Sequence, residues 1–170
     1  MIINNINQFK IDGVVELAPA TNHVIQSISH KETGDLIIYT QFICASENSS
    51  KNNLVNFVKR HMHKDGMSIR KLLIITPSSV GCDYLKKVIN ENNFRNVSVY
   101  KTSVVTTNFI IEKKKVLFGA ENFLEHSSTN SPSVTINDSR CRSTFIEYTK
   151  ELLKISLPVV RNQFDNELFN

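Results

Sequence analysis

Few residues of this chain stand at spacings that would let them act together in chemistry. The five histidines include His61 and His63, which lie two residues apart on a predicted helix and so point in different directions. A metal pair on a helix needs a spacing of four residues. The three cysteines form no CxxC pair and have no histidine neighbour that would favour a thiolate. We therefore expect neither a metal site nor a catalytic cysteine.

Phosphate-binding and nucleophile motifs are missing as well. The sequence contains no GxxxxGK[ST], no GxGxxG and no GxSxG. The segment 77–82 (PSSVGC) has one glycine before a predicted helix, and an anion could bind at such a helix start. An ordinary strand-to-helix turn is the interpretation we favour there. The carboxylates show no pairing pattern, so the residues by themselves indicate no class of enzyme.

The basic residues are only weakly clustered. The formal net charge is +4, which permits an anionic partner without requiring one. Two segments concentrate the positive charge: Lys59, Arg60 and Lys64 in the first, and Lys113, Lys114 and Lys115 in the second. We interpret the first as a solvated helix end and the second as an exposed hairpin turn. Contact with nucleic acid or another anion is the alternative interpretation of both.

Composition favours one globular domain. The chain has 170 residues, of which 41% are hydrophobic and 21% charged, as is usual for a folded domain with a core. Unpaired cysteines suit a reducing compartment. The first ten residues do not resemble a signal peptide, and no apolar run approaches the roughly 20 residues that span a bilayer. We therefore expect a cytoplasmic protein without a membrane partner.

The hydrophobic pattern predicts strands that alternate with helices. Strands are predicted at 12–18, 36–43, 69–76, 97–100 and 134–137, with a hairpin formed by 109–111 and 116–118. Helices are predicted around 54–62, 83–92 and 145–153. This order predicts an α/β fold with a mixed, mostly parallel central sheet and helices on both faces. We assign residues 1–157 to one domain and residues 158–170 to a C-terminal tail or short appended helix.

The segment 106–123, TTNFIIEKKKVLFGAENF, resembles the signature of the phospholipase D superfamily. In that family the pattern HxKxxxxD precedes a short hydrophobic strand and a Gly-Ser-x-Asn-like turn. Here the strand VLF is followed by Gly119, Ala120, Glu121 and Asn122, which is similar to that turn. Residues 130–153 resemble the asparagine, strand and closing helix that come next. The resemblance covers about residues 20–155 and implies a phospholipase D-like fold.

The resemblance also implies that the catalytic residues are missing. In active members the histidine becomes a phosphohistidine and the lysine holds phosphate oxygens, but these positions are Thr106 and Asn108 here. Lys113 stands at the aspartate position. Threonine without an adjacent base is a poor nucleophile, and asparagine cannot neutralise a phosphate. We therefore expect a catalytically degenerate domain rather than an enzyme.

Degenerate domains of this kind imply a binding function. The effector domains of archaeal TrmB-type regulators resemble phospholipase D without its catalytic residues and hold small ligands. By analogy, we expect a ligand-binding, sensory or regulatory module without a cofactor. The expected ligand is a small polar molecule held by Thr106, Asn108, Asn122 and Asn130. Single-motif members pair their motifs across a two-fold axis, so a homodimer is expected.

Two alternatives remain open at this stage. One is a nuclease or phosphodiesterase with a rearranged site, in which His126 replaces the missing base. The other is a plain protein-interaction module. Its docking stretch would be the apolar stripe of Val160, Phe164 and Leu168, which recur at helical spacing in the tail.

Overall fold

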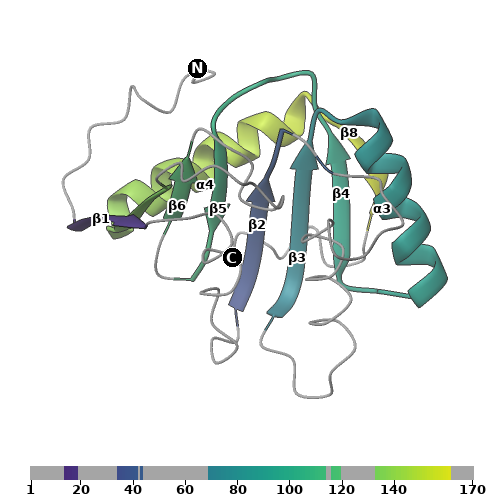
Figure 1. Cartoon of the computed structure of the whole chain (residues 1–170), viewed down its shortest axis with the longest axis horizontal. Helices are drawn as coiled ribbons and strands as arrows, with labels where there is room; N and C mark the ends of the chain where they lie inside the picture. Colours follow the sequence, from purple (N-terminus) through teal and green to yellow (C-terminus); the bar gives the residue numbers. More distant parts are fainter. Residues whose placement is uncertain are drawn as a thin grey trace.

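The computed structural model describes residues 14–18, 34–41, 43, 69–113, 116–119 and 133–161. These residues form an eight-stranded sheet with the order β1-β7-β6-β5-β2-β3-β4-β8 (Figure 1). The strands are β1 (Val14–Ala18), β2 (Gly34–Tyr39), β3 (Ile69–Thr76), β4 (Val97–Lys101), β5 (Asn108–Ile111), β6 (Val116–Gly119), β7 (Ser133–Asn137) and β8 (Leu157–Val160). The helices of the described part are α3 (Ser79–Asn92) and α4 (Ser139–Lys154).

Only the middle of this sheet is parallel. Strand β3 pairs in parallel with β2 and with β4, whereas all the other described pairings are antiparallel. The predicted α/β class and mixed sheet are confirmed, but the expectation that most of the sheet is parallel is wrong. The second half of the chain supplies β5, β6 and β7, which follow one another as antiparallel neighbours and therefore need no crossover helix.

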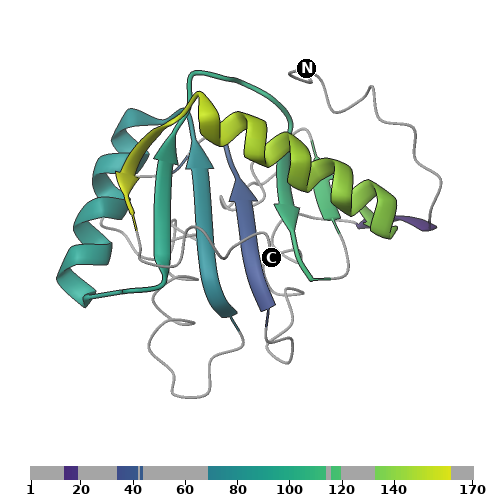
Figure 2. The ribbon, with the colours of Figure 1, turned by 180° about the vertical axis from the view of Figure 1, so that it is seen from behind.

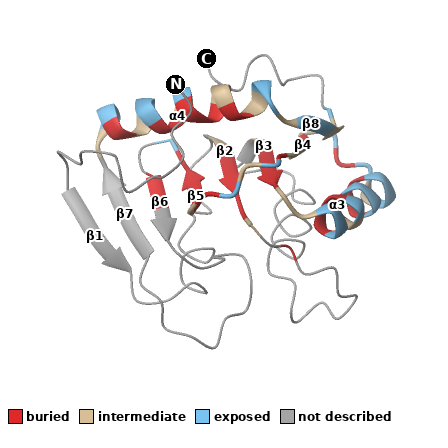
Figure 3. Ribbon diagram, turned by 90° about the horizontal axis from the view of Figure 1, so that it is seen from above, coloured by how far each residue is buried: buried red, intermediate tan, exposed pale blue. Residues whose placement is uncertain are grey.

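Strands β2 and β3 are apolar on both faces because both faces are covered. Residues 36–39 and 72–75 are almost completely buried. Successive strand residues point to opposite sides, so each strand contributes to two separate cores. Figure 3 shows α4 on one side of the sheet and α3 on the other, which confirms the prediction of helices on both faces.

Helix α3 covers one face and begins earlier than the sequence pattern predicts. Its N-cap is Ser78, whose Oγ accepts a hydrogen bond of 3.0 Å from the backbone N–H of Gly81. A Cβ at Gly81 would lie 2.6 Å from Cβ of Ile43, so glycine permits this close approach. The helix ends at Asn93, which has a φ of 54° in the left-handed region. Its inner face buries Cys82, Leu85, Val88 and Ile89.

Helix α4 covers the opposite face, across which it runs in Figure 2. Its N-cap is Asp138, whose carboxylate accepts a hydrogen bond of 2.9 Å from the N–H of Arg140. The prediction missed the first six residues because they are mainly polar and carry no apolar period. The buried face of α4 contributes Cys141, Phe145, Tyr148 and Leu152 to a core with Ile37, Tyr39, Leu73 and Ile75.

Strand β8 lies where a tail or short helix was expected. It pairs antiparallel with β4, with Leu157 opposite Lys101 and Val160 opposite Val99. Pro158 is compatible with this position because β8 is an edge strand of the described sheet. The expectation of a tail or helix is therefore wrong for residues 158–160, and so is a helical stripe that begins at Val160. Residues 162–170 and the predicted helix at 54–62 lie outside the described residues.

Candidate functional site

The candidate site lies at the carboxyl ends of β2, β3 and β4, where the chain turns to enter β5. The parallel strands point to this edge, at the top of Figure 1. Backbone hydrogen bonds of 3.0 Å continue past the strand ends, from Thr40 N to Ile75 O and from Thr102 N to Thr76 O. Buried polar residues gather along this edge: Thr40, Thr76, Thr102, Thr106 and Asn108. Carboxyl ends of parallel strands are the usual location of ligand sites in open α/β sheets.

Two of the predicted site residues, Thr106 and Asn108, are brought to this edge, but neither is open to solvent. Thr106 is 5% exposed and Asn108 is fully buried. Oδ1 of Asn108 accepts a hydrogen bond of 2.7 Å from the backbone N–H of Gln41. The side-chain amide of Gln41 donates to the carbonyl of Thr106. A lysine could not replace Asn108 as acceptor, so this position has a structural task that the family's lysine could not perform.

Tyr39 makes the second connection between β2 and the segment before β5. Its hydroxyl donates to the carbonyl of Val104 at 2.8 Å and accepts from the backbone N–H of Thr106 at 3.1 Å. Burial raises the pKa of Tyr39 to about 12, an effect that the backbone hydrogen bond from Thr106 partly opposes. The phenol therefore stays neutral at physiological pH and serves to position the segment.

Tyr148 of α4 faces the same segment. Burial raises the pKa of its phenol, and the nearby hydroxyl of Thr106 acts in the opposite direction. Neither Tyr148 Oη nor Thr106 Oγ1 has a hydrogen bond of normal distance and angle, although both atoms are buried. Native structures seldom leave buried hydroxyls in this condition without a reason. Both hydroxyls therefore retain capacity for a further partner.

Of the remaining predicted site residues the structure describes only Lys113, which does not lie beside this pair. Lys113 is exposed and follows the far end of β5. At about 3.3 Å per strand residue, it lies on the order of 20 Å along the chain from Thr106. The other predicted residues lie outside the described ones: Lys59, Arg60, Lys64, Lys114, Lys115, Asn122, His126 and Asn130.

Sequence reasoning missed Tyr39, Gln41 and Tyr148. The strand 36–43 (LIIYTQFI) was interpreted by its apolar character alone, although it contains a tyrosine and a glutamine. A buried tyrosine brings a hydroxyl that needs a partner, and this requirement was the available indication. Tyr148 was assigned correctly to the inner face of the closing helix, but nothing local shows that its hydroxyl meets Thr106.

The described residues give little support to metal binding or to thiol chemistry. They contain no group of three histidine, cysteine or acidic side chains that could hold a metal ion. Cys82 and Cys141 are free and buried, and burial raises the pKa of both thiols, to about 11 for Cys82. A thiol with a raised pKa is a poor nucleophile at neutral pH. No helix in the part of the chain that the structure describes is long and apolar enough to cross a membrane.

The described residues combine a mixed sheet with a parallel centre, a helix against each face and a polar edge where β5 begins, which is the arrangement of a phospholipase D-like fold. Comparison with solved structures shows the same fold. Nuc from Salmonella typhimurium, a phospholipase D family member, superposes with a TM-score of 0.59 at 13% identity, over 86% of this chain and 98% of that one. NucT from Helicobacter pylori gives 0.58 at 12% identity, over 86% and 99%.

A third similar structure is that of TrmBL2, an archaeal chromatin protein with a novel mode of DNA binding. The TM-score is 0.55 at 13% identity. The match covers 88% of this chain but 55% of TrmBL2, so the chain spans about half of that protein. No protein-family model and no curated protein matches the sequence. At these identities the comparisons establish the fold, and the fold is the one that the sequence resemblance implied.

Proposed function

We propose that this chain is a non-catalytic, ligand-binding module of phospholipase D-like fold with a sensory or regulatory role. The observation that carries the proposal is the burial and hydrogen bonding of Thr106 and Asn108. By the sequence resemblance these residues stand where active relatives have histidine and lysine. Both are buried: the backbone N–H of Thr106 donates to the Tyr39 hydroxyl, and Oδ1 of Asn108 accepts from the backbone N–H of Gln41. Asn108 is an uncharged, buried acceptor, and the hydroxyl of Thr106 has no base beside it in the described part, so these side chains are not suited to act as phosphate clamp and nucleophile.

The electrostatics of the described edge support the same proposal. A general base needs a pKa near the operating pH, but Tyr39 and Tyr148 have pKa values raised above their ordinary value. Thr106 has no base beside it in the described part. The buried polar side chains of this edge (Thr40, Thr76, Thr102, Thr106 and Asn108) are uncharged and offer hydrogen bonding.

The ligand that fits this chemistry is a small neutral molecule with several hydroxyl groups, such as a polyol or a sugar. Thr106 Oγ1 and Tyr148 Oη can each donate to it and accept from it. In this proposal Asn108 supports the site through Gln41, while Asn122 and Asn130 complete it. A small anion is the less favoured ligand because none of the buried polar side chains at this edge carries a positive charge.

Self-association is part of the proposal. Four large apolar side chains are markedly exposed in the described structure, namely Val80, Val105, Ile155 and Leu157. All four follow or flank the carboxyl ends of β3 and β4, next to the candidate site. Exposed apolar groups concentrated at one edge are typical of an interface. The proposed homodimer therefore forms across this edge.

A cleavage assay tests the absence of catalysis. Single-stranded DNA, double-stranded DNA and a generic phosphodiester are incubated with the chain, with and without divalent metal, while binding to the same DNAs is measured in parallel. No turnover is expected. Turnover that survives repurification and is lost in His126→Ala would overturn the proposal in favour of a rearranged phosphodiesterase, the alternative that the family resemblance supports. DNA binding without turnover would make nucleic acid the partner instead of a polyol.

Thermal unfolding tests the ligand. Polyols, sugars and inorganic phosphate are screened for a rise in Tm, which ligand binding to the folded state must produce. The rise caused by a positive compound should disappear in Thr106→Val. It should persist in Thr149→Val, because that buried hydroxyl already donates to Phe145 O at 2.8 Å within α4. Equal loss in both variants would place the ligand elsewhere.

Light scattering over a range of concentrations tests the dimer. The double substitution Val105→Glu and Leu157→Glu should yield monomers, because it introduces charge into the proposed interface. A matched pair on the exposed side of α4, Ser143→Glu and Thr144→Glu, should leave the dimer intact. A monomeric unmodified chain at all concentrations would remove self-association from the proposal.

A further inference from the structure

The two hydroxyl groups that the proposed ligand contacts are closed to solvent. Oγ1 of Thr106 and Oη of Tyr148 are both buried, and the two residues are 5% and 3% exposed. A molecule in solution therefore reaches neither atom unless part of the protein moves. A device that admits a ligand here deepens the proposed function and, as a route of entry, rests on it.

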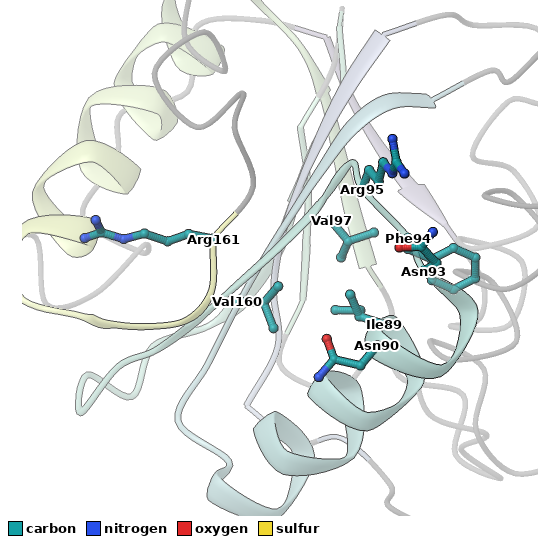
Figure 4. Close-up of a pocket in the computed structure, with 8 residues that line it drawn as sticks. All are labelled: Ile89, Asn90, Asn93, Phe94, Arg95, Val97, Val160 and Arg161. Atoms are coloured by element: carbon teal, nitrogen blue, oxygen red, sulfur yellow. The ribbon is translucent and has the colours of Figure 1, made fainter.

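A pocket at the other end of β4 gives no access to these hydroxyls. It has a volume of ≈ 450 Å³ and lies between the end of α3, the start of β4 and the end of β8 (Figure 4). The residues that line it fall within 89–97 and 160–161, so neither the segment before β5 nor α4 contributes to it. Entry to the candidate site therefore requires the movement of a structural element.

The connection between β4 and β5, residues 102–107, is the element best suited to move. It passes over the carboxyl ends of β3 and β2 and forms neither helix nor strand (Figures 1 and 2). Thr102 is buried and still hydrogen-bonded to the sheet. Between β4 and β5 the sheet crosses three strand spacings, about 14 Å. The chain from Lys101 to Asn108 can span up to about 25 Å, so residues 103–107 have length to spare.

Few interactions fasten this connection to the sheet. The Tyr39 hydroxyl donates to Val104 O at 2.8 Å and accepts from Thr106 N–H at 3.1 Å. The side-chain amide of Gln41 donates to Thr106 O. Val104 is only partly buried, and Val105 is 65% exposed. Hydrogen bonds between neutral groups add little net stability where water can replace them, so release of the connection costs far less than unfolding of the domain.

Helix α4 is the less favourable element to move. It spans 16 residues and buries five of them: Cys141, Phe145, Tyr148, Thr149 and Leu152. Its displacement would expose this apolar core to water. We propose that residues 103–107 form a gate, which Tyr39 latches and which opens without unfolding of the rest of the domain. Opening of the gate uncovers the hydroxyls of Thr106 and Tyr148.

Thiol labelling measures the opening directly. Thr106→Cys places a thiol on the gate, and Cys82, which is 2% exposed beneath α3, is the internal reference. Iodoacetamide labelling at each position is followed by peptide mass spectrometry, and each rate is divided by its rate in the unfolded chain. Position 106 should be labelled more than about tenfold faster than Cys82, because local opening is easier than global unfolding. Equal protection of the two positions would overturn the proposal.

Three substitutions in the Thr106→Cys background separate the gate from global unfolding. Ile74→Ala, in the core of the α3 face, should accelerate labelling of Cys82 and leave position 106 unchanged. Tyr39→Phe removes the latch and should accelerate labelling at position 106 by about tenfold. Tyr84→Phe deletes the same atom from α3 and should not. Parallel acceleration of both positions in Ile74→Ala, or an unchanged rate in Tyr39→Phe, would show that no such gate exists.

The gate and the proposed ligand can fail separately. Labelling needs no ligand, so protection of position 106 equal to that of Cys82 removes the gate even if a polyol raises Tm. A screen without any active polyol or sugar removes the proposed ligand, while labelling still decides whether the gate opens. The labelling is done at low protein concentration because Val105 belongs to the proposed dimer interface.

Discussion

The two faces of the central sheet are built from different chemistry, although the same strands supply both. On the α3 face β2 contributes Leu36 and Ile38, which meet an almost entirely aliphatic core. On the α4 face it contributes Ile37 and Tyr39, which meet aromatic rings. Phe109 stacks on Tyr39 at a centroid distance of 5.4 Å and contacts Phe145 edge-on at 5.5 Å.

This difference shows where a function can be placed in such a fold. On the α3 face only size and shape decide stability, because there are almost no polar groups to satisfy. On the α4 face the hydroxyls of Tyr39 and Tyr148 differ in their hydrogen bonding. The Tyr39 hydroxyl makes two hydrogen bonds, whereas the Tyr148 hydroxyl makes none of normal geometry. The candidate site is therefore an extension of the aromatic core, in which the Tyr39 hydroxyl supports the fold and the Tyr148 hydroxyl retains capacity for a further partner.

The largest expected effect is the loss of volume on the α3 face. Ile74→Ala, at a fully buried position of β3, should lower the free energy of unfolding by about 2–5 kcal/mol. Urea unfolding followed by circular dichroism measures it. Lys86→Ala on the exposed side of α3 is the control and should change stability by less than about 0.5 kcal/mol. A loss below about 1 kcal/mol in Ile74→Ala would show that this face is loosely packed.

Overpacking the same face should also destabilise the protein. Alanine is preferred to glycine in a helix by about 1 kcal/mol, so Gly81→Ala would stabilise α3 in isolation. The added Cβ would lie 2.6 Å from Cβ of Ile43, which is not the movable end of a side chain. Overpacking of this kind costs about 1–3 kcal/mol, so a net loss is expected in urea unfolding. A gain in stability would mean that α3 shifts easily away from Ile43.

On the α4 face, the loss of a single oxygen atom should lower the free energy of unfolding about as much as the methyl group added at Gly81. Tyr39→Phe keeps the ring stacked on Phe109 but leaves Thr106 N–H without its acceptor and Val104 O without its donor. Loss of one partner of a buried polar group costs about 1–3 kcal/mol. The free energy of unfolding measures this cost directly. An unchanged value would show that water replaces the phenol and that the segment before β5 does not depend on it.

Elements that depend on local sequence could be predicted, whereas elements that depend on contacts with distant parts of the chain could not. Strand 69–76 was predicted with its observed bounds, because a continuous β-branched run is a local property. The phospholipase D-like fold was predicted from one turn and the order of elements. The start of α3 was missed because Ser78 and Gly81 resemble a loop until the approach of Ile43 is known. Strand β8 was missed because Pro158 argues against a strand except at an edge, and edges are defined only by the whole sheet.

The hydrogen bonds of the site could not be predicted, for a related reason. Tyr39, Gln41, Thr106 and Asn108 are joined across about 65 residues of chain. Their pairing depends on the antiparallel register of β2 and β5, in which Tyr39 lies opposite Phe109. A sequence shows which of these side chains need partners but not which partners the register will supply.

Alkaline titration should expose the buried phenol of Tyr39. Its pKa in the folded state is about 12, above the ordinary value of 10.0, so the fold disfavours the charged form. Its contribution to stability is complete below pH 10 and is lost as the pH rises from 10 towards 12. The free energy of unfolding should fall over this range, and less steeply in Tyr39→Phe. The pKa values of Cys82, Cys141 and Tyr148 are also raised, so these groups account for the pH dependence of the free energy of unfolding that remains in Tyr39→Phe.

The smallest expected effect on stability is that of Tyr148→Phe, and it makes the sharpest test of the contrast with Tyr39. The Tyr148 hydroxyl is buried without a normal hydrogen bond, so its removal should leave the free energy of unfolding unchanged or raise it by up to about 1 kcal/mol. The measurement is the same urea unfolding used for Tyr39→Phe, in which the same atom is deleted from the same residue type.

A loss of stability in Tyr148→Phe would show that its hydroxyl is bonded to Thr106 after all. A double-mutant cycle with Thr106→Val would then give a coupling energy of about 0.5–3 kcal/mol, whereas independent hydroxyls give none. The ligand screen completes the test, because a hydroxyl that does not stabilise the fold can be retained for binding. If Tyr148→Phe keeps its stability but loses the rise in Tm caused by a bound polyol, the aromatic face carries a binding site. If both are unchanged, the hydroxyl belongs to neither the fold nor the site.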